Sequence, residues 1–427
     1  MKHQPGLGFL ITDLSGGGAE RVVSNLARGL DDHRRELFVF RDRQAYPFDG
    51  EIHLLDLPLV GEGPLWRRLS PFATLRALLR LGRLKRATEV ERCISFLTWP
   101  NLFNILTGAG EEVIISVRNH PTSSIRGPLS PVIRAMMRAL YPRADHVVAI
   151  SEGVRRDLVE NFGVPPEKIT RIYNPLRLDE IERRRHHPLP PTWETYMERR
   201  PAILTMGRLV PQKGQWHLLR AFAALKSMRP EARLILLGEG PLQATLLALS
   251  EDLGLRTGLW HPGSTHPWPD PPPDADVLFG GFLENPFPLM ARARVFAFPS
   301  LWEGLGNVLI ESLAVGLPVV AADCHAGPRE ILTGCPLPDG RGISAPDWTE
   351  NGVLMPCCDG ELRDAYEPLT SAEAHWAQVL DELLDDTDQR RAFVAAGPRR
   401  AQAFDLPVIT QEWRRLLCRR DPPCPPR

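Results

Sequence analysis

Short apolar runs alternate with longer helical patterns along the chain, and this alternation limits the fold more than any other feature. The runs are bounded by turn residues, as strands buried inside a sheet are. Strands are expected near residues 8–11, 37–40, 93–96, 113–117, 146–150, 170–173, 202–206, 233–237, 277–280, 295–298, 318–321 and 352–355. Because strands that alternate with helices form parallel sheets, the sequence predicts an α/β protein.

The length of 427 residues exceeds what one ordinary hydrophobic core supports, so we expect two domains. Both are predicted to be Rossmann-like, with parallel sheets that face each other across a cleft. Proline residues interrupt the pattern between the two sets of strands and indicate a connector. The predicted divisions are 1–181 for the N-terminal domain, 182–200 for the connector, 201–400 for the C-terminal domain, 401–420 for a helix that returns to the N-terminal domain, and 421–427 for a disordered tail. Residues 257–275 and 333–351 are expected to be loop-like insertions.

Composition narrows the class of protein. A formal net charge of −1 argues against a dedicated nucleic-acid binder. The seven cysteines show no metal-type spacing, so reduced thiols and no bound metal are expected. The sequence shows no secretory signal pattern and no long apolar stretch. These features predict a cytoplasmic protein.

The segment from Pro299 to Ala321 places two carboxylates around a glycine-rich helix start. Gly304 and Gly306 leave backbone amides open to an anion such as a diphosphate. Glu303 precedes the helix, while Glu311 lies about a turn and a half inside it, where its carboxylate can accept two hydrogen bonds from a ribose diol. The alternative is that the two glutamates are only a charge near a helix N-terminus and a solvated helix residue.

This segment resembles the donor-site signature of the retaining GT-B glycosyltransferases of family 4, also called glycosyl transferases group 1. Four more blocks stand in the order of that family, namely Met206–Gly214, Leu236–Pro241, Gly281–Ala293 and Ala326–Leu332. Looser likeness is found in Ser15–Val22, Ile115–Asn119, Val148–Val154 and Ile172–Pro175. Several blocks in family order are a stronger signal than a single glycine motif. The resemblance therefore covers nearly the whole chain and implies a GT-B fold.

The resemblance also implies roles for individual residues of the C-terminal, nucleotide-sugar-binding domain. Glu303 is expected to contact hydroxyls of the donor sugar, and Arg208 and Lys213 to neutralise the leaving diphosphate. Other residues are expected to bind the rest of the donor. The sugar or phosphate is assigned to Gly304, Leu305 and Gly306, the ribose to Glu311, and the base to Gly238, Glu239 and Phe282. Without the resemblance, Arg208 and Lys213 would be interpreted as solvated loop residues.

The N-terminal domain is expected to bind the acceptor. Gly17 and Gly18 follow its first strand, and small residues there allow the loop to come close to the donor phosphates or to the acceptor. A dinucleotide loop is the rival interpretation, but Arg21 stands where the third glycine of that motif belongs, so an oxidoreductase receives little weight. His120 is expected over the transferred sugar, as a catalytic residue. A lone loop histidine is more often a surface residue.

The implied reaction is transfer of a sugar from a UDP- or GDP-sugar to a glycan or a polyprenyl-diphosphate-linked acceptor, with retention at the anomeric carbon. Polysaccharide or lipopolysaccharide synthesis is the expected setting. The nucleotide sugar acts as co-substrate, and no cofactor or metal is expected. Two alternatives stay open: a GT-B sugar-nucleotide epimerase, and a non-catalytic GT-B scaffold subunit.

Residues 64–86 are rich in arginine and contain no acid. Leu75, Leu78, Leu79 and Leu81 recur at helical spacing beside arginines, as in a helix that lies on anionic lipid. Peripheral contact with the inner face of the plasma membrane is one interpretation. The other is that the leucines pack on the sheet while the arginines face water.

Overall fold

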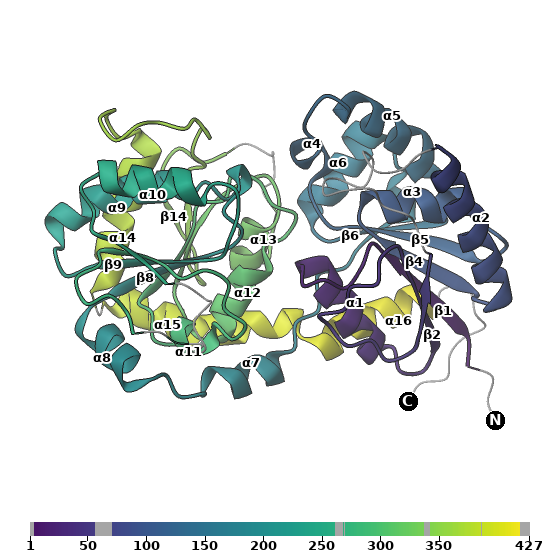
Figure 1. Ribbon diagram of the computed structural model, residues 1–427, viewed down its shortest axis with the longest axis horizontal. Coiled ribbons are helices and arrows are strands. Elements are labelled where there is room, and N and C mark those ends of the chain that lie inside the picture. The colour runs from purple at the N-terminus through teal and green to yellow at the C-terminus, as the bar shows by residue number, and fades with distance from the viewer. Residues whose placement is uncertain are drawn as a thin grey trace. The chain divides into compact units, whose positions relative to one another are not determined.

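The computed structural model describes residues 4–55, 71–260, 268, 270–336, 342–385 and 387–418. The chain forms two compact units (Figure 1). The first unit contains Met1–Leu176 and Phe404–Arg427, and the second unit contains Arg177–Ala403. The division therefore falls at Leu176 and not at residue 181. The predicted tail 421–427 lies outside the described residues.

The expected connector is helical and belongs to the second unit. It contains the end of α7 (Leu178–Arg185) and all of α8 (Pro191–Arg199). Pro191 occupies the first turn of α8, where a missing N–H has no intrahelical partner to lose. The prolines there start a helix, whereas the sequence pattern suggested a break.

The first unit is built on a parallel sheet of seven strands in the order β3-β2-β1-β4-β5-β6-β7. Its strands are β1 (Gly6–Ile11), β2 (Arg34–Val39), β3 (Glu51–Leu54), β4 (Arg92–Phe96), β5 (Glu112–Val117), β6 (His146–Ala149) and β7 (Ile169–Arg171). The sequence pattern missed β3, an edge strand whose side chains are exposed or half-buried. An edge strand of this kind lacks the apolar run that marks a central strand.

Helices cover both faces of this sheet. They are α1 (Gly18–Gly29), α2 (Pro71–Ala87), α3 (Thr98–Leu106), α4 (Pro121–Ser124), α5 (Ser130–Leu140), α6 (Glu152–Phe162) and α16 (Leu406–Leu417). Phe9 belongs to the apolar cluster with α1 and α16, while its neighbour Leu10 belongs to the cluster with α2. Trp413 of α16 is fully buried in the first of these clusters. The last helix is thus part of the core of the first unit.

The second unit contains an eight-stranded sheet in the order β10-β11-β9-β8-β12-β13-β15-β14, in which only the β14–β15 pair is antiparallel. Its strands are β8 (Ala202–Met206), β9 (Arg233–Leu237), β10 (Thr257–Leu259), β11 (Val277–Phe279), β12 (Val295–Phe298), β13 (Val319–Ala322), β14 (Asp347–Trp348) and β15 (Val353–Met355). The short edge strands β10 and β14 lie within the two segments expected to be loops, which corrects that expectation.

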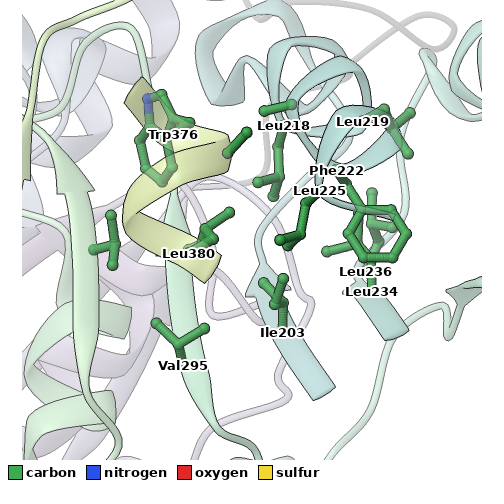
Figure 2. Packing of buried hydrophobic residues seen from close by; sticks show 14 of the residues in the cluster. Ile203, Leu218, Leu219, Phe222, Leu225, Leu234, Leu236, Val295, Trp376 and Leu380 are labelled. Atoms are coloured by element: carbon green, nitrogen blue, oxygen red, sulfur yellow. The ribbon is translucent and has the colours of Figure 1, made fainter. Parts of the chain in front are cut away.

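The remaining helices of the second unit are α9 (Gln215–Met228), α10 (Gln243–Asp252), α11 (Phe287–Met290), α12 (Asn307–Ala314), α13 (Pro328–Thr333), α14 (Ser371–Leu384) and α15 (Asp388–Ala401). Helices α9 and α14 lie side by side over the sheet. Figure 2 shows Phe222 of α9 and Leu380 of α14 in the same apolar cluster as Ile203 of β8. Among the helices of the described ranges, none combines the length and apolar character needed to cross a membrane.

A buried polar network joins α9 to α14. His217 Nδ1 lies 2.8 Å from a carboxylate oxygen of Glu373, and Arg220 Nε donates to the same oxygen at 3.0 Å. Burial acts to raise the pKa of Glu373, but the hydrogen bonds from His217 and Arg220 outweigh it and lower the pKa to about 2. Glu373 is therefore ionised, while Nε2 of His217, on the far side of the ring, has no hydrogen-bond partner in the described part of the chain.

Candidate donor-binding edge and acceptor-side residues

Strand β12 leads into α12 through the segment that carries the paired glutamates. Gly306, the residue before α12, has φ +93°, and no side chain caps the helix. A glycine at this position brings backbone and no capping side chain to the start of the helix. Glu303 in the loop and Glu311 on the helix are both buried. The alternative of a solvated helix glutamate therefore does not hold for Glu311, which is 4% exposed.

Lys213 lies directly against Glu303. Its ammonium is 2.5 Å from the carboxylate and 4.9 Å from the ring centroid of Phe298, the last residue of β12. Lys213 follows β8 on a short 3₁₀ turn (Pro211–Lys213). The structure thus brings one predicted phosphate-binding cation to the predicted sugar-binding carboxylate.

Arg208 also follows β8, and its side chain is exposed. Its backbone carbonyl accepts a hydrogen bond from Gln215 at 3.1 Å, which holds the loop to the start of α9. Within the described ranges Arg208 forms no ion pair of 4.0 Å or less. Gly214, the residue before α9, provides no side-chain cap, so an exposed arginine beside this helix start is suited to bind an anion.

Gln212 is a positioning residue that sequence reasoning missed. Its side chain donates to the carbonyl of Trp302 at 2.8 Å, and its own carbonyl accepts from the amide of Leu301 at 2.8 Å. These two bonds hold the loop that carries Glu303 against the turn that carries Lys213. The residue stands within the Met206–Gly214 block, but only the tertiary contact reveals its role.

The glycine loops after β8, β9 and β11 meet at one edge of the sheet. A Cβ on Gly238 would lie 2.1 Å from the carbonyl oxygen of Gly207, and φ of Gly238 is +128°. The Gly238 amide donates to the carbonyl of Gly281 at 2.6 Å. Phe282 follows with an exposed ring, and Glu239 follows Gly238. The predicted base-binding residues therefore lie on loops that touch one another.

The loop between β13 and α13 also lies at this edge of the sheet. A Cβ on Gly327 would lie 2.1 Å from the carbonyl oxygen of Leu305, so the loop before α13 packs on the loop before α12 through bare backbone. Asp323, just after β13, forms a 2.7 Å ion pair with Arg329. Apart from Glu311, which stands on α12, the donor-binding residues predicted in the second unit therefore lie on loops that follow the carboxyl ends of its strands. Ligands bind at this edge in open α/β sheets.

The remaining predicted site residues belong to the first unit. Gly17 is the residue before α1, has no side-chain cap, and is followed by Gly18, the first residue of the helix. His120 precedes the short helix α4; its Nδ1 lies 3.0 Å from the Ser123 hydroxyl and 3.6 Å from a carboxylate oxygen of Asp157. His120 is thus half-buried and held by neighbours, unlike a free surface histidine.

Three potential metal ligands gather elsewhere in the described part of the first unit. Glu36, Glu51 and His53 place ligand atoms within 4.8 Å of one another on β2 and β3. Glu36 already accepts from Arg34 at 3.1 Å and contacts His53 at 2.7 Å. The arginine satisfies the carboxylate, so the group is explained as an ion-pair cluster. That the protein needs no metal stays a prediction.

Helix α2 presents two different faces. Leu81 is fully buried in the core of the first unit, as the packing interpretation requires. Phe72 is 86% exposed, and Leu75 and Leu79 on the same face are more than half exposed. Arg76 and Arg83 are exposed as well. We call Phe72, Leu75, Leu79, Arg76 and Arg83 the α2 stripe; residues 64–70 lie outside the described ranges.

Comparison with known proteins agrees with these features. The family model described as glycosyl transferases group 1 matches residues 200–359, and the glycosyltransferase family 4 model matches residues 16–180. A glycosyltransferase of Methanocaldococcus jannaschii is 31% identical over 72% of this chain and 71% of its own length. A Campylobacter jejuni N-acetylgalactosamine-N,N'-diacetylbacillosaminyl-diphospho-undecaprenol 4-alpha-N-acetylgalactosaminyltransferase is 30% identical over 95% of this chain and 97% of its own.

A solved structure extends the likeness to the fold. HepE of Anabaena, in complex with UDP and glucose, superposes with a TM-score of 0.69 at 19% identity, covering 97% of this chain and 99% of its own. The α/β architecture described above is thus the GT-B fold. The two family models and the two relatives agree, and the chain therefore belongs to glycosyltransferase family 4.

Proposed function

We propose that the protein transfers a sugar from a UDP- or GDP-sugar to an acceptor built on a polyprenyl diphosphate, with retention of the anomeric configuration. The observation that carries this proposal is the buried pair Glu303 and Glu311 around the uncapped start of α12, with Lys213 against Glu303. The Campylobacter relative, which by its name acts on a diphospho-undecaprenol substrate, supports the class of acceptor.

The reaction needs negative charge on the leaving diphosphate to be stabilised as the glycosidic bond breaks. Arg208 and Lys213 supply fixed positive charge, and the first amides of α12 supply hydrogen-bond donors. In this proposal Glu303 binds hydroxyls of the sugar, and Glu311 accepts hydrogen bonds from the ribose. Phe282, with the glycine loop after β9, contacts the base.

The acceptor hydroxyl attacks from the same side of the sugar that the diphosphate leaves. An oxygen of the departing diphosphate then takes the proton of the attacking hydroxyl, which accounts for retention without a separate side-chain base. His120 lies at the carboxyl edge of the other sheet and is proposed to contact the transferred sugar. A sugar-nucleotide epimerase would need no acceptor, and the lipid-linked substrate named for the relative favours a transferase.

We further propose that the α2 stripe binds anionic membrane, where a lipid-linked acceptor is found. A helix face with an exposed phenylalanine and two leucines next to arginines suits the interface of an anionic bilayer. Flotation with phosphatidylglycerol-containing vesicles at low salt tests this. The Phe72→Ser/Leu75→Ser/Leu79→Ser variant is expected to stay unbound, while Leu362→Ser, an exposed leucine of the second unit, floats like wild type. Equal flotation of the triple variant would exclude the stripe as the contact.

Saturation-transfer NMR against UDP-, GDP-, ADP- and CMP-sugars tests the donor site. We expect selective binding of one donor, lost in Glu311→Gln because an amide replaces one ribose acceptor by a donor. Glu251→Gln, at an exposed glutamate of α10, is the matched control and should bind as wild type. Binding that is equal in all three proteins would contradict the assignment of Glu311. No binding by wild type would favour the scaffold alternative.

A further inference from the structure

Arg118 in the first unit is a cation whose partners are all neutral. It follows the last residue of β5, and its Nη1 donates to the Ser116 hydroxyl at 3.2 Å. Its Nη2 donates to the side-chain oxygen of Asn174. The Nε is enclosed and has no hydrogen-bond partner within the described part of the chain. In the same part of the chain, no carboxylate forms an ion pair with this guanidinium.

The absence of an acid partner distinguishes Arg118 from the buried Arg220. Arg220 lies 3.0 Å from the Glu373 carboxylate, so its charge is compensated. Burial lowers the pKa of Arg118 to about 9, and no carboxylate acts in the opposite direction. A desolvated cation without a counter-ion is unfavourable for folding. Such a group is typical of a site that receives its anion from a ligand.

The neighbouring start of α3 also favours a bound anion. The Arg118 guanidinium lies 5.5 Å from the ring centroid of Phe96, the residue just before Leu97, where α3 starts. Leu97 has φ +76°, which is strained for a leucine, and no side chain caps the helix. The Thr98 hydroxyl instead interacts with Tyr141. The amides at the start of this nine-residue helix therefore carry positive charge that no side chain compensates. Asn101 in the first turn of α3 donates to the carbonyl of Ser116, whose hydroxyl accepts from Arg118, so the helix start and the guanidinium share a neighbour.

We propose that Arg118 and the amino end of α3 form a second phosphate-binding site, located in the first unit and distinct from the donor-binding edge of the second unit. The guanidinium N–H groups that Ser116 and Asn174 do not use, together with the uncapped amides, are its hydrogen-bond donors. Taking the proposed function as given, the ligand is the diphosphate of the acceptor, because the donor diphosphate already has Arg208, Lys213 and the start of α12.

The site is tested on the full chain by titration calorimetry with inorganic pyrophosphate. The Arg208→Gln/Lys213→Gln background removes the cations of the donor-binding edge. Binding that remains in this background is expected to weaken about 10- to 100-fold when Arg118→Gln is added, as for the loss of a charged hydrogen-bond donor. Arg118→Lys, which keeps the charge, should retain part of the affinity. Arg126→Gln, at an exposed arginine of the same unit, is the control and should change nothing.

A merely structural role for Arg118 makes a different prediction. If the residue only fastens Ser116 to Asn174, Arg118→Gln should lower Tm, because hydrogen bonds are lost. If its charge is uncompensated, Tm should stay equal or rise, while the stabilisation of the protein by pyrophosphate disappears. Unchanged pyrophosphate binding in the background would overturn the site. So would a lowered Tm together with wild-type binding by Arg118→Lys and Arg118→Met.

The source of the phosphate group is resolved by two further titrations. Farnesyl diphosphate added to UDP-saturated protein represents the lipid-linked source, and UDP alone represents the donor. We expect Arg118→Gln to weaken farnesyl diphosphate binding and to leave UDP binding unchanged. The reverse result would assign Arg118 to the donor and refute the acceptor assignment. Failure of Arg208→Gln/Lys213→Gln to affect UDP binding would count against the proposed function alone, since the Arg118 titrations do not depend on it.

Discussion

Removal of Lys213 should expose how strongly the donor-binding edge depends on its ion pair. The ammonium is 2.5 Å from Glu303, and the two side chains are only 17% and 8% exposed. Lys213→Met deletes the charge and keeps much of the apolar stem. It leaves the Glu303 carboxylate in a poorly solvated position with its cation gone, which is unfavourable.

The size of the effect follows from the exposure of the two groups. Breaking one side of a fully buried pair costs about 3–5 kcal/mol, whereas an exposed pair contributes about 0–1 kcal/mol. The Lys213–Glu303 pair is much nearer the buried limit, so Lys213→Met should lose about 2–3 kcal/mol in the free energy of unfolding. Contact with the Phe298 ring adds about 0.5–1 kcal/mol to that loss. Glu303→Gln should cost less, because the amide oxygen still accepts a hydrogen bond.

Urea unfolding of wild type, Lys213→Met, Glu303→Gln and the double variant forms a double-mutant cycle. We expect a coupling free energy of about 1.5–2.5 kcal/mol, with the double variant more stable than the sum of the single losses implies. The pair Arg229–Asp385, whose side chains are 30% and 55% exposed, provides the control cycle and should couple by less than about 1 kcal/mol. Coupling below about 0.5 kcal/mol for Lys213 and Glu303 would refute the reasoning from burial.

Three other outcomes are expected. Glu373 has a folded pKa of about 2 against an ordinary value of 4.5, so its contribution of about 3 kcal/mol is complete above pH 4.5 and is lost as pH falls toward 2. Urea midpoints of wild type and Glu373→Gln should therefore converge on acidification; parallel curves would disprove this. Trp413→Ala should cost about 3–5 kcal/mol by calorimetry, since α16 fills the core of the first unit. A change below 1 kcal/mol would contradict that packing. Gly238→Ala should weaken donor binding, because its Cβ would meet the Gly207 carbonyl at 2.1 Å; unaltered affinity would show that the two loops separate freely.

The central strands were predictable from the sequence because they are continuous apolar runs buried on both faces. The strands that were missed, β3, β10 and β14, are short or half-exposed and lie at or next to a sheet edge. Helix α8 was missed because proline breaks a helix when it lies in the interior but is favourable in the first turn, where Pro191 lies. Local pattern does not distinguish these two positions.

The candidate site was predictable where its residues are neighbours in sequence, as Glu303 and Glu311 are. It was not predictable where the decisive fact is the set of contacts around a side chain. Gln212 holds the Glu303 loop through a hydrogen bond that spans 90 residues, and Arg118 differs from the buried Arg220 in that its guanidinium binds neutral side chains. Both properties arise from tertiary packing, which one sequence does not display.

The crossing of the chain between units has a consequence for synthesis on the ribosome. Leu176, where the chain leaves the first unit, is bonded to Phe404 and Leu406, where it comes back, and Trp413 then fills the core. The second unit is one continuous segment and can fold as it emerges. The first unit waits until the final helix has been translated, with the apolar surface that Trp413 covers open to chaperones during that interval.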